Sequence, residues 1–528
     1  MAKPSYKPLL FTTTMRNPQR IKAMLWVLKK FDGQILNDKL AIQIVGETIR
    51  YGLYRPMRKS DSIKAKWLNA PMGEFGNELL SDAEVDFMIT NNPQEHKEAG
   101  FDRGYSSRFA TIFDFAKELG FVYFTPGEPI EFSSIGDKLA SVFDVNVTVD
   151  GVISVEEVHP EYEQQAFLHA MCKSQRANPF VKVLNDNVPL ILLLQVLKKI
   201  NADPRWNGKG ITRKELPLLI FWKDNDAEAL YQRICQLREE YRYNPSDEVI
   251  VDICRNDIMG GQMKKFDTAS VITEYPDEYI RKMRITGLIS LRGAGRFIDL
   301  NHNEDERIDY VLKNYSTYPH FDSERDYFNY MAKADENLFS IEANHVSPSQ
   351  SEDLLKEWVK EINWKTIKKE LEVLAKRSRT SDHQVLKFIP APVRLEFLSA
   401  LAIKSKLPDV RVIPNYACDD TGLPTSTAGG GIGDIECIEN ANGVLVEVTM
   451  SEGRQQTMME IWPITRHLRE FKDKYTSNSQ CVFIAPSIFS DSHMQIRFVG
   501  ATEGDVIRPY PISDFIEYLE TATTLYTA

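Results

Sequence analysis

Two acidic residues near the C-terminal end of the sequence are spaced so that they could hold a divalent metal ion. Asp434 begins a short apolar run, Asn442-Gly443 is a strong signal for a hairpin turn, and Glu447 lies within the β-rich run 444–450. A hairpin would bring the two carboxylates together. A carboxylate inside an apolar strand costs free energy unless it is paired or binds a metal, so the pattern predicts a Mg²⁺ site.

A metal held by this pair could stabilise charge on a phosphate, generate hydroxide from bound water and favour departure of the 3′ oxygen. Glu460 and His467 are seven residues apart, which is two helical turns, so they would share one face of a continuous helix. Pro463 lies between them and could interrupt the hydrogen bonds of that helix. Histidine titrates near neutrality, so His467 could act as a general base or hold the attacking water. Glu396 lies on an apolar face of the helix predicted from Pro392. The candidate catalytic residues are therefore Asp434, Glu447, His467, Glu460 and Glu396, with the first two as metal ligands.

Each of these residues also has a plainer interpretation. A lone acidic residue in a strand usually lies at an edge or in an ion pair, and a lone helical histidine is usually structural. The combination in this order favours the metal site. The glycine run Gly429–Gly433 has neither the GxGxxG spacing nor a following Lys-Ser/Thr, which excludes a P-loop. We expect this run to let a DNA backbone approach closely.

Length and composition indicate a large multidomain protein. The 528 residues exceed what one hydrophobic core organises, so two to four domains are expected. No apolar run approaches the ~20 residues that cross a bilayer, and the first residues lack the apolar segment of a signal peptide, which favours a cytoplasmic protein without membrane contact. The six cysteines contain no CxxC pair, which argues against zinc ribbons and a disulfide framework.

The charge is unevenly distributed along the chain. The net charge is −11, yet residues 1–80 carry fourteen Lys and Arg against six Asp and Glu, a local net charge of +8. Phosphate neutralisation is the main non-specific source of affinity for DNA, so this basic front end is a candidate DNA surface. A solvated surface without a partner is the alternative. The candidate DNA contacts are Arg16, Arg20, Arg55, Arg58, Lys59, Arg103 and Arg108.

Local patterns divide the chain into a front region, a connector and a C-terminal domain. Pro18 suits the first position of an amphipathic helix near 18–30. The order helix, glycine, strand, turn, strand occurs twice, with Gly120 and Gly287 where a helix C-cap needs positive φ. A winged helix ends in this order, and such modules contact either DNA or other proteins. Ser349 and Glu352 have capping-box spacing within the charged, helical stretch 301–380.

The expected fold is therefore a multidomain α+β protein. We predict two recognition subdomains with winged-helix-like ends, over residues 1–150 and 151–300. A helical linker over 301–385 and a C-terminal α/β domain over 386–528 would follow them.

The stretch from Glu396 to Pro486 resembles the AlwI family of type IIS restriction endonucleases, which has BstNBI-like nicking enzymes among its relatives. The likeness rests on RLEFLSAL, AGGGIGDIE, LVEVT, MMEIWPITRH and CVFIAP. The resemblance implies a PD-(D/E)xK nuclease domain that follows a DNA-recognition region and a linker. It also implies dependence on Mg²⁺, with Mn²⁺ able to replace it, and cleavage outside a short asymmetric target that is GGATC-like or GAGTC-like.

One position departs from the wider superfamily. The lysine expected two residues after Glu447 is Thr449, which cannot supply the missing positive charge. The resemblance implies that Glu460 and His467 serve in its place. The partners it implies are double-stranded DNA, a transient homodimer through the catalytic domain or a small nuclease subunit, and a cognate DNA methyltransferase as genetic partner.

The sequence therefore predicts a Mg²⁺-dependent, site-specific deoxyribonuclease of type IIS. A strand-specific nicking enzyme, or the large subunit of a heterodimeric restriction enzyme, has the same site residues and differs only in pairing. A non-catalytic winged-helix DNA-binding regulator is the alternative from another class, in which the C-terminal carboxylates are structural.

Overall fold

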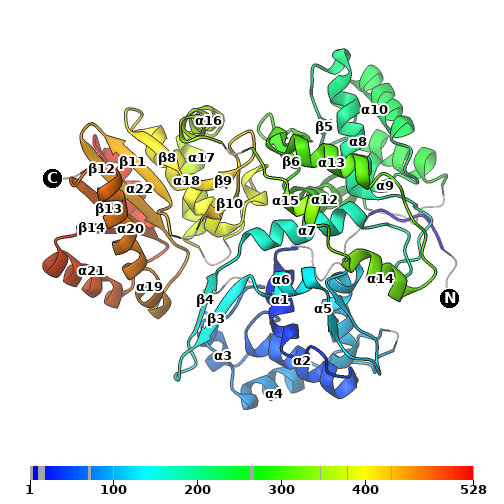
Figure 1. Cartoon of the computed structure of the whole chain (residues 1–528), viewed down its shortest axis with the longest axis horizontal. Helices are drawn as coiled ribbons and strands as arrows, with labels where there is room; N and C mark the ends of the chain where they lie inside the picture. The colour runs from blue at the N-terminus through cyan, green and yellow to red at the C-terminus, as the bar shows by residue number, and fades with distance from the viewer. Residues whose placement is uncertain are drawn as a thin grey trace. The chain divides into compact units, whose positions relative to one another are not determined.

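The computed structural model describes residues 4–9, 18–68, 70, 73–98, 100–261, 267–344, 346–376, 379–429 and 431–526. The chain forms two compact units. The first comprises Met1–Asn146 and Val155–Asn344, and the second comprises Val147–Ser154 and His345–Ala528. Helices and strands are mixed in both (Figure 1), so the expected α+β class is confirmed, while the four domain ranges stay predictions. No helix in the described ranges is long and apolar enough to cross a membrane.

The first part of the chain is mainly helical. The predicted helix near 18–30 is present as α1, which buries Leu25 and Leu28 on its inner face. The elements up to residue 157 are α1 (Arg20–Lys29), α2 (Asp38–Arg50), α3 (Asp61–Lys66), α4 (Asp82–Asn91), α5 (Tyr105–Glu118), β1 (Val122–Tyr123), β2 (Glu131–Phe132), α6 (Ser134–Ala140), β3 (Phe143–Val147) and β4 (Ile153–Glu157).

The remainder of the first unit surrounds a small antiparallel sheet in the strand order β5-β7-β6. Its elements are α7 (Glu161–Lys173), α8 (Pro189–Ala202), η2 (Pro204–Trp206), β5 (Ile211–Thr212), α9 (Leu216–Phe221), α10 (Ala227–Tyr241), α11 (Asp247–Asp252), η3 (Ile253–Ile258), η4 (Ser270–Glu274), α12 (Tyr275–Arg284), β6 (Ile289–Arg292), β7 (Phe297–Leu300), η5 (His302–Glu304), α13 (Asp305–Asn314), α14 (Glu324–Ala332) and α15 (Glu336–Ser340).

Both predicted helix-glycine-hairpin segments are present. Gly120 follows α5 with φ +77°, and Gly287 follows α12 with φ +80°, ahead of the paired strands β1-β2 and β6-β7. A Cβ atom at Gly120 would collide with Met331, and one at Gly287 with Gln164. Glycine is therefore favoured at both positions by conformation, and at Gly120 it is also required by space, because the Gln164 side chain beside Gly287 can move. The winged-helix assignment of these segments stays a prediction.

The predicted capping box at Ser349 and Glu352 is wrong by two residues. Ser347 is the N-cap of α16, and its side chain exchanges hydrogen bonds with Gln350. Pro348 then occupies the first helical position, where a missing N–H costs nothing. Glu352 instead accepts a hydrogen bond from the buried Lys404 at 2.9 Å.

The second unit is built on a five-stranded sheet in the order β14-β13-β12-β11-β8. Strand β12 lies at its centre, antiparallel to β11 and parallel to β13. The elements are α16 (Pro348–Glu361), α17 (Trp364–Leu374), η6 (Leu386–Phe388), α18 (Ala391–Lys406), β8 (Arg411–Pro414), β9 (Tyr416–Cys418), β10 (Pro424–Ala428), β11 (Ile435–Glu439), β12 (Asn442–Val448), α19 (Arg454–Met459), α20 (Ile461–Lys474), β13 (Ser479–Ala485), α21 (Ser490–Glu503), β14 (Ile507–Pro511) and α22 (Ile512–Thr521).

The side-chain alternation of β12 decides which residues meet α20. Leu445 packs with Ile464 and Leu468 of α20 and with Phe483 of β13 in one buried cluster. Side chains two residues apart on a strand share a face. Glu447 therefore points to the same side of the sheet as Leu445, toward α20.

Candidate active site

The register of the β11-β12 hairpin places Asp434 and Glu447 opposite each other. Ile435 pairs with Val446, so one further step outward along both strands brings Asp434 to Glu447. Residues directly opposite in an antiparallel pair share a face of the sheet. The backbone amide of Val448 donates a 2.7 Å hydrogen bond to Asp434 Oδ2. The structure thus brings together the two residues that the sequence predicted as metal ligands.

The residues that form the hairpin turn differ from the prediction. Asn442 and Gly443 are the first two residues of β12, and Asn440 and Ala441 make the turn. Asn440 has φ +55°, a left-handed conformation that asparagine tolerates better than most residues. Gly443 serves the packing instead, because a Cβ atom there would collide with Ser479. The segment contains two asparagines. The Asn442-Gly443 pair predicted the turn, but Asn440 is the asparagine that forms it.

The two carboxyl groups are destabilised in their charged forms. Burial raises the pKa of Asp434 well above its usual range, and the neighbouring Glu447 raises it further. The hydrogen bond from the Val448 amide lowers this pKa, but by less than the other two effects raise it. Burial likewise raises the pKa of Glu447, and Glu460 and Glu396 add to the effect. Each of these carboxyls therefore lies where its charged form is disfavoured by burial and by neighbouring acids. A bound cation would offset this unfavourable charge, because an opposite charge nearby favours the ionised form of a carboxyl.

Gly433 lets the chain pass close to this pair. A Cβ atom at Gly433 would lie 2.8 Å from Glu447 Oε1 and would collide with Leu445. The Gly433 carbonyl accepts a 2.7 Å hydrogen bond from Asn415 Nδ2, which fixes the segment that leads into β11. Gly430 lies outside the described residues. The expected approach of a DNA backbone to this glycine run stays a prediction.

His467 is oriented by Glu447. Its Nδ1 lies 3.0 Å from Glu447 Oε1, while its Nε2 is buried and has no hydrogen-bond partner within the described part of the chain. Burial and the nearby Arg466 lower the pKa of His467, so the ring is neutral at neutral pH. When Glu447 is ionised it can only accept a hydrogen bond, so the ring proton then lies on Nδ1 and Nε2 keeps a free lone pair. Pro463 lies in the first turn of α20 and does not interrupt the helix that carries His467.

Glu460 lies at the N-cap of α20 and is held by two hydroxyl groups. Thr449 Oγ1 donates to Glu460 Oε1 at 2.7 Å, and Ser451 Oγ donates to the same oxygen at 2.9 Å. Thr449 follows Leu445 and Glu447 on the same alternation, which explains why it reaches α20. Thr449, which occupies the position of the expected lysine, therefore holds the Glu460 carboxylate by a hydrogen bond. The sequence did not single out Ser451, and its only signal was its proximity to Glu447.

Glu396 reaches the site from α18. Its Oε2 accepts a 3.1 Å hydrogen bond from the backbone amide of Ala428. Burial raises the pKa of Glu396 well above its usual range, and the charge of Asp434 adds to this. Glu396 is buried, as expected for a residue on the apolar side of this helix, and the burial of α18 extends over every residue from Val393 to Lys404.

The donor set suits an ion that is only partly held by protein. No group of three or more His, Cys, Asp and Glu among the residues described here has metal-ligand geometry. The convergent oxygens come from Asp434 and Glu447. Mg²⁺ commonly binds one or two protein carboxylates and completes its octahedron with water and substrate phosphate. The pair therefore fits Mg²⁺ better than an ion that demands a complete protein cage.

The predicted DNA contacts lie on several different elements, and some of their side chains bind backbone carbonyls within the fold. Arg16 lies outside the described residues. Arg55 is buried and donates to the carbonyls of Gly52 and Ala70. Its guanidinium is therefore occupied by the fold and is not exposed to a phosphate. Arg20 is half-buried and donates to the Leu53 carbonyl at 3.3 Å, and burial lowers its pKa.

The other candidates lie nearer the solvent. Arg58 is exposed and Lys59 is half-buried. Arg103 is exposed and forms an ion pair with Glu95 at 3.1 Å. Arg108 is half-buried and donates to the side chain of Gln94. Arg58, Lys59, Arg103 and Arg108 stay candidate DNA contacts.

Comparisons with known proteins cover most of the chain. The sequence model of the AlwI restriction endonuclease family matches residues 117–356 and 340–517. The small subunit (R.BspD6I2) of the heterodimeric restriction endonuclease R.BspD6I is 24% identical and covers 29% of this chain and 75% of its own, with a TM-score of 0.24. Restriction endonuclease FokI bound to DNA is 11% identical and covers 99% and 97%, with a TM-score of 0.22. Curated protein sequences give no match.

Proposed function

Because the chain belongs to the AlwI restriction endonuclease family, we propose that it is a type IIS enzyme that hydrolyses DNA at a distance from its recognition site. The proposed target is a short asymmetric sequence, GGATC-like or GAGTC-like, and the proposed cofactor is Mg²⁺, with Mn²⁺ able to replace it. The observation that carries the proposal is the cross-strand pair Asp434 and Glu447, which the register of the β11-β12 hairpin places opposite each other, with Glu447 buried.

In this proposal Asp434 and Glu447 hold Mg²⁺, which when bound stabilises charge on the scissile phosphate. Glu447 also keeps His467 in the tautomer whose Nε2 is free. That nitrogen accepts a proton from the attacking water, which is a task for a base that is neutral at working pH. Glu460, restrained by Thr449 and Ser451, is placed to orient the same water. Cleavage of the bond between phosphorus and the 3′ oxygen then gives a 5′-phosphate on one fragment and, once the departing oxygen takes up a proton from water, a 3′-hydroxyl on the other.

Digestion of a supercoiled plasmid of known sequence tests the activity. We expect Mg²⁺-dependent linear fragments whose sequenced ends lie at a constant offset from one short motif. Open circles without linear product would identify a nicking enzyme, or a large subunit that lacks its small partner. A metal-independent gel shift without any strand break would instead support the DNA-binding regulator and overturn the proposal.

The hydroxyl tether of Glu460 gives a second expected result. The double variant Thr449→Val/Ser451→Ala leaves Glu460 without these two donors, because valine and alanine have no hydroxyl. Loss of such supporting contacts typically costs about 10–100-fold in metal affinity or activity. We therefore expect single-turnover cleavage to fall by that factor while the melting temperature changes little.

Thr449→Ser keeps the donor and is the matched control. It should cleave at close to the wild-type rate. Equal rates for the double variant and the wild type would show that Glu460 needs no tether.

A further inference from the structure

Four residues far apart in the sequence form one aromatic and cationic patch on the first unit. The rings of Tyr243 and Phe297 meet edge to face, with centroids 5.6 Å apart. Lys209 Nζ lies 5.7 Å from the Tyr243 centroid, and the Arg296 guanidinium lies 5.9 Å from Tyr243 and 5.5 Å from Phe297. Lys209 and Arg296 are exposed, and both rings are half-buried. We call these four residues the Tyr243 patch.

The small sheet of the first unit assembles this patch. Thr212 of β5 pairs with Phe297 of β7, and Lys209 lies two residues ahead of β5. Arg296 is the last residue of the turn between β6 and β7. Tyr243 lies just beyond the C-terminal end of α10. The small sheet therefore fixes the backbone positions from which both cations reach the rings.

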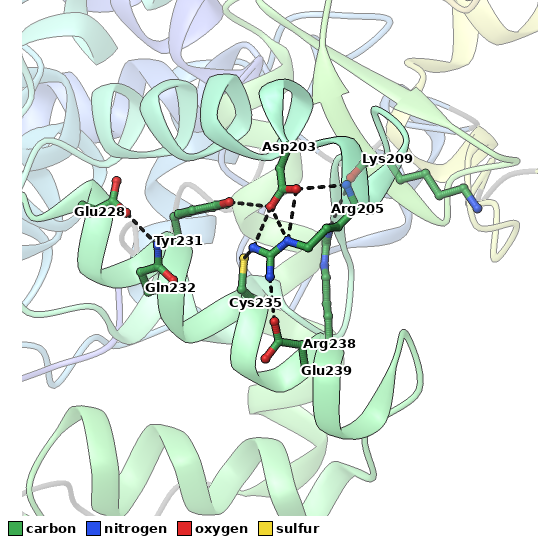
Figure 2. A network of polar contacts seen from close by, with 9 residues as sticks. All are labelled: Asp203, Arg205, Lys209, Glu228, Tyr231, Gln232, Cys235, Arg238 and Glu239. Atoms are coloured by element: carbon green, nitrogen blue, oxygen red, sulfur yellow. Dashed lines mark hydrogen bonds and ion pairs between the residues drawn. The ribbon is translucent and has the colours of Figure 1, made fainter.

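A polar network fixes the loop that carries Lys209 (Figure 2). Asp203 accepts hydrogen bonds from Tyr231 Oη at 2.6 Å and from Arg205 Nη2 at 2.7 Å, and Arg205 Nη1 reaches Glu239 at 2.7 Å. Arg205 is thereby neutralised by two acids. Figure 2 shows the Lys209 side chain extending away from this network. The network positions the loop and leaves Lys209 outside it.

A second ion pair lies beneath the Tyr243 ring. The Arg238 guanidinium is 5.1 Å from the ring centroid and pairs with Glu215 at 2.8 Å. It also donates to the carbonyl of Gly210 at 2.6 Å, next to Lys209. This buried pair is electrically balanced. The charge at the outer side of the ring therefore comes from Lys209 and Arg296.

Within the described ranges, no acidic residue forms an ion pair with Lys209 or Arg296, and both face the Tyr243 ring. Two cations that face one ring repel each other and gain only a modest attraction from it. An anion between or above them would remove that repulsion. The patch therefore has the electrostatic character of an anion-binding site.

The loops that carry the patch also contain uncommon backbone conformations. Five described residues other than glycine have positive φ, and three of them lie in these loops: Asn207 at +50°, Arg242 at +55° and Ala294 at +52°. Such conformations cost free energy and persist where the surrounding structure imposes them, as at ligand clamps. The strain accompanies the positions that present Lys209, Tyr243 and Arg296.

We propose that the Tyr243 patch binds the sugar-phosphate backbone of the DNA duplex. Lys209 and Arg296 each contact a phosphate, and the Tyr243 and Phe297 rings pack against the adjoining deoxyribose. Contacts of this kind set register and affinity without reading bases. This inference rests on the proposed function and adds a surface that the charge count over residues 1–80 did not reveal.

The test measures binding of fluorescent duplexes by anisotropy, with Ca²⁺ in place of Mg²⁺ to prevent cleavage. One duplex carries the site mapped by plasmid digestion, and the other is unrelated. For Lys209→Ala/Arg296→Ala we expect binding to both duplexes to weaken roughly tenfold for each cation removed. The slope of log affinity against log salt should fall in magnitude by about two.

Lys313→Ala is the matched control, because Lys313 is an exposed lysine of the same unit outside the patch. It should leave affinity and salt slope unchanged. An unchanged slope for the double variant with a wild-type melting temperature, or weakening of the cognate duplex alone, would overturn the backbone-contact role. Absence of wild-type binding to either duplex at low salt would overturn the proposed function and this inference together.

Discussion

Asp434→Asn is expected to abolish DNA cleavage while leaving DNA binding intact. The substitution keeps the size of the side chain and an oxygen that can accept the hydrogen bond from Val448. It removes one of the two negative charges that would hold Mg²⁺. The ion contributes several kcal/mol of charge stabilisation, so we expect single-turnover cleavage to fall by roughly 10³-fold or more. Asp434→Ala should lose activity to the same extent.

Binding measured by gel shift or anisotropy in Ca²⁺ distinguishes lost chemistry from a lost fold. We expect the affinity of Asp434→Asn for DNA to stay within about twofold of wild type, because the proposed DNA contacts lie on other elements. The neighbouring Glu436 is also acidic but forms an ion pair with Lys474 at 2.9 Å. Glu436→Gln is therefore the control that removes a nearby charge and should keep its activity. Mg²⁺-dependent cutting by pure Asp434→Asn would refute the assignment.

The second large effect is on the stability of the metal-free protein as a function of pH. Burial and mutual repulsion raise the folded-state pKa values of Asp434 and Glu447 above the ordinary values of an unfolded chain. A raised folded-state pKa contributes stability that is fully present below the unfolded pKa. That stability is lost as pH rises through the folded pKa. The metal-free protein should therefore lose stability as pH rises above the ordinary carboxyl pKa toward the raised folded-state values.

Asp434→Asn/Glu447→Gln should not show this loss, because neutral amides do not titrate. We expect the metal-free double variant to melt about 5 °C or more above wild type at pH 8, which corresponds to a few kcal/mol. Mg²⁺ should raise the melting temperature of the wild type and leave that of the variant unchanged. Scanning calorimetry in EDTA and in Mg²⁺ measures both effects.

Asp505 supplies a control with the opposite sign. Burial alone would raise the pKa of Asp505, but hydrogen bonds from Lys472 and Arg469 outweigh it and hold that pKa below the usual value. Its contribution to stability is present above the unfolded pKa and is lost as pH falls, so Asp505→Asn should destabilise the protein at pH 8. Parallel pH curves for wild type and Asp434→Asn/Glu447→Gln would contradict the repulsion between the two carboxyls.

The β11-β12 hairpin could be predicted because its sequence signals are local. Strand alternation and one turn signal were enough to bring Asp434 and Glu447 together. The turn itself was misplaced, because Asn440 takes the left-handed position and Gly443 is needed for packing beside Ser479. The role of Thr449 could not be predicted, because it depends on how close the first turn of α20 comes to the end of β12.

Charge counting along the sequence located the basic region but not its exposed cations. Arg55 raises the count over residues 1–80, yet the fold uses its guanidinium to bind backbone carbonyls. The Tyr243 patch has no sequence signature, because Lys209, Tyr243 and Arg296 come together only when β5, α10 and the β6-β7 turn have folded. A count of charges does not show which side chains reach the surface.

The hydroxyl at position 449 has a consequence for the order in which the reacting groups assemble. An ammonium group there would attract a DNA phosphate at all times, whereas threonine leaves this place just beyond β12 without a charge of its own. Until a divalent ion arrives, the neighbouring carboxylates repel the phosphodiester. Under the proposed function, loading of the ion then precedes or accompanies seating of the scissile bond. Without divalent ions, the enzyme would stay bound to DNA without cutting it.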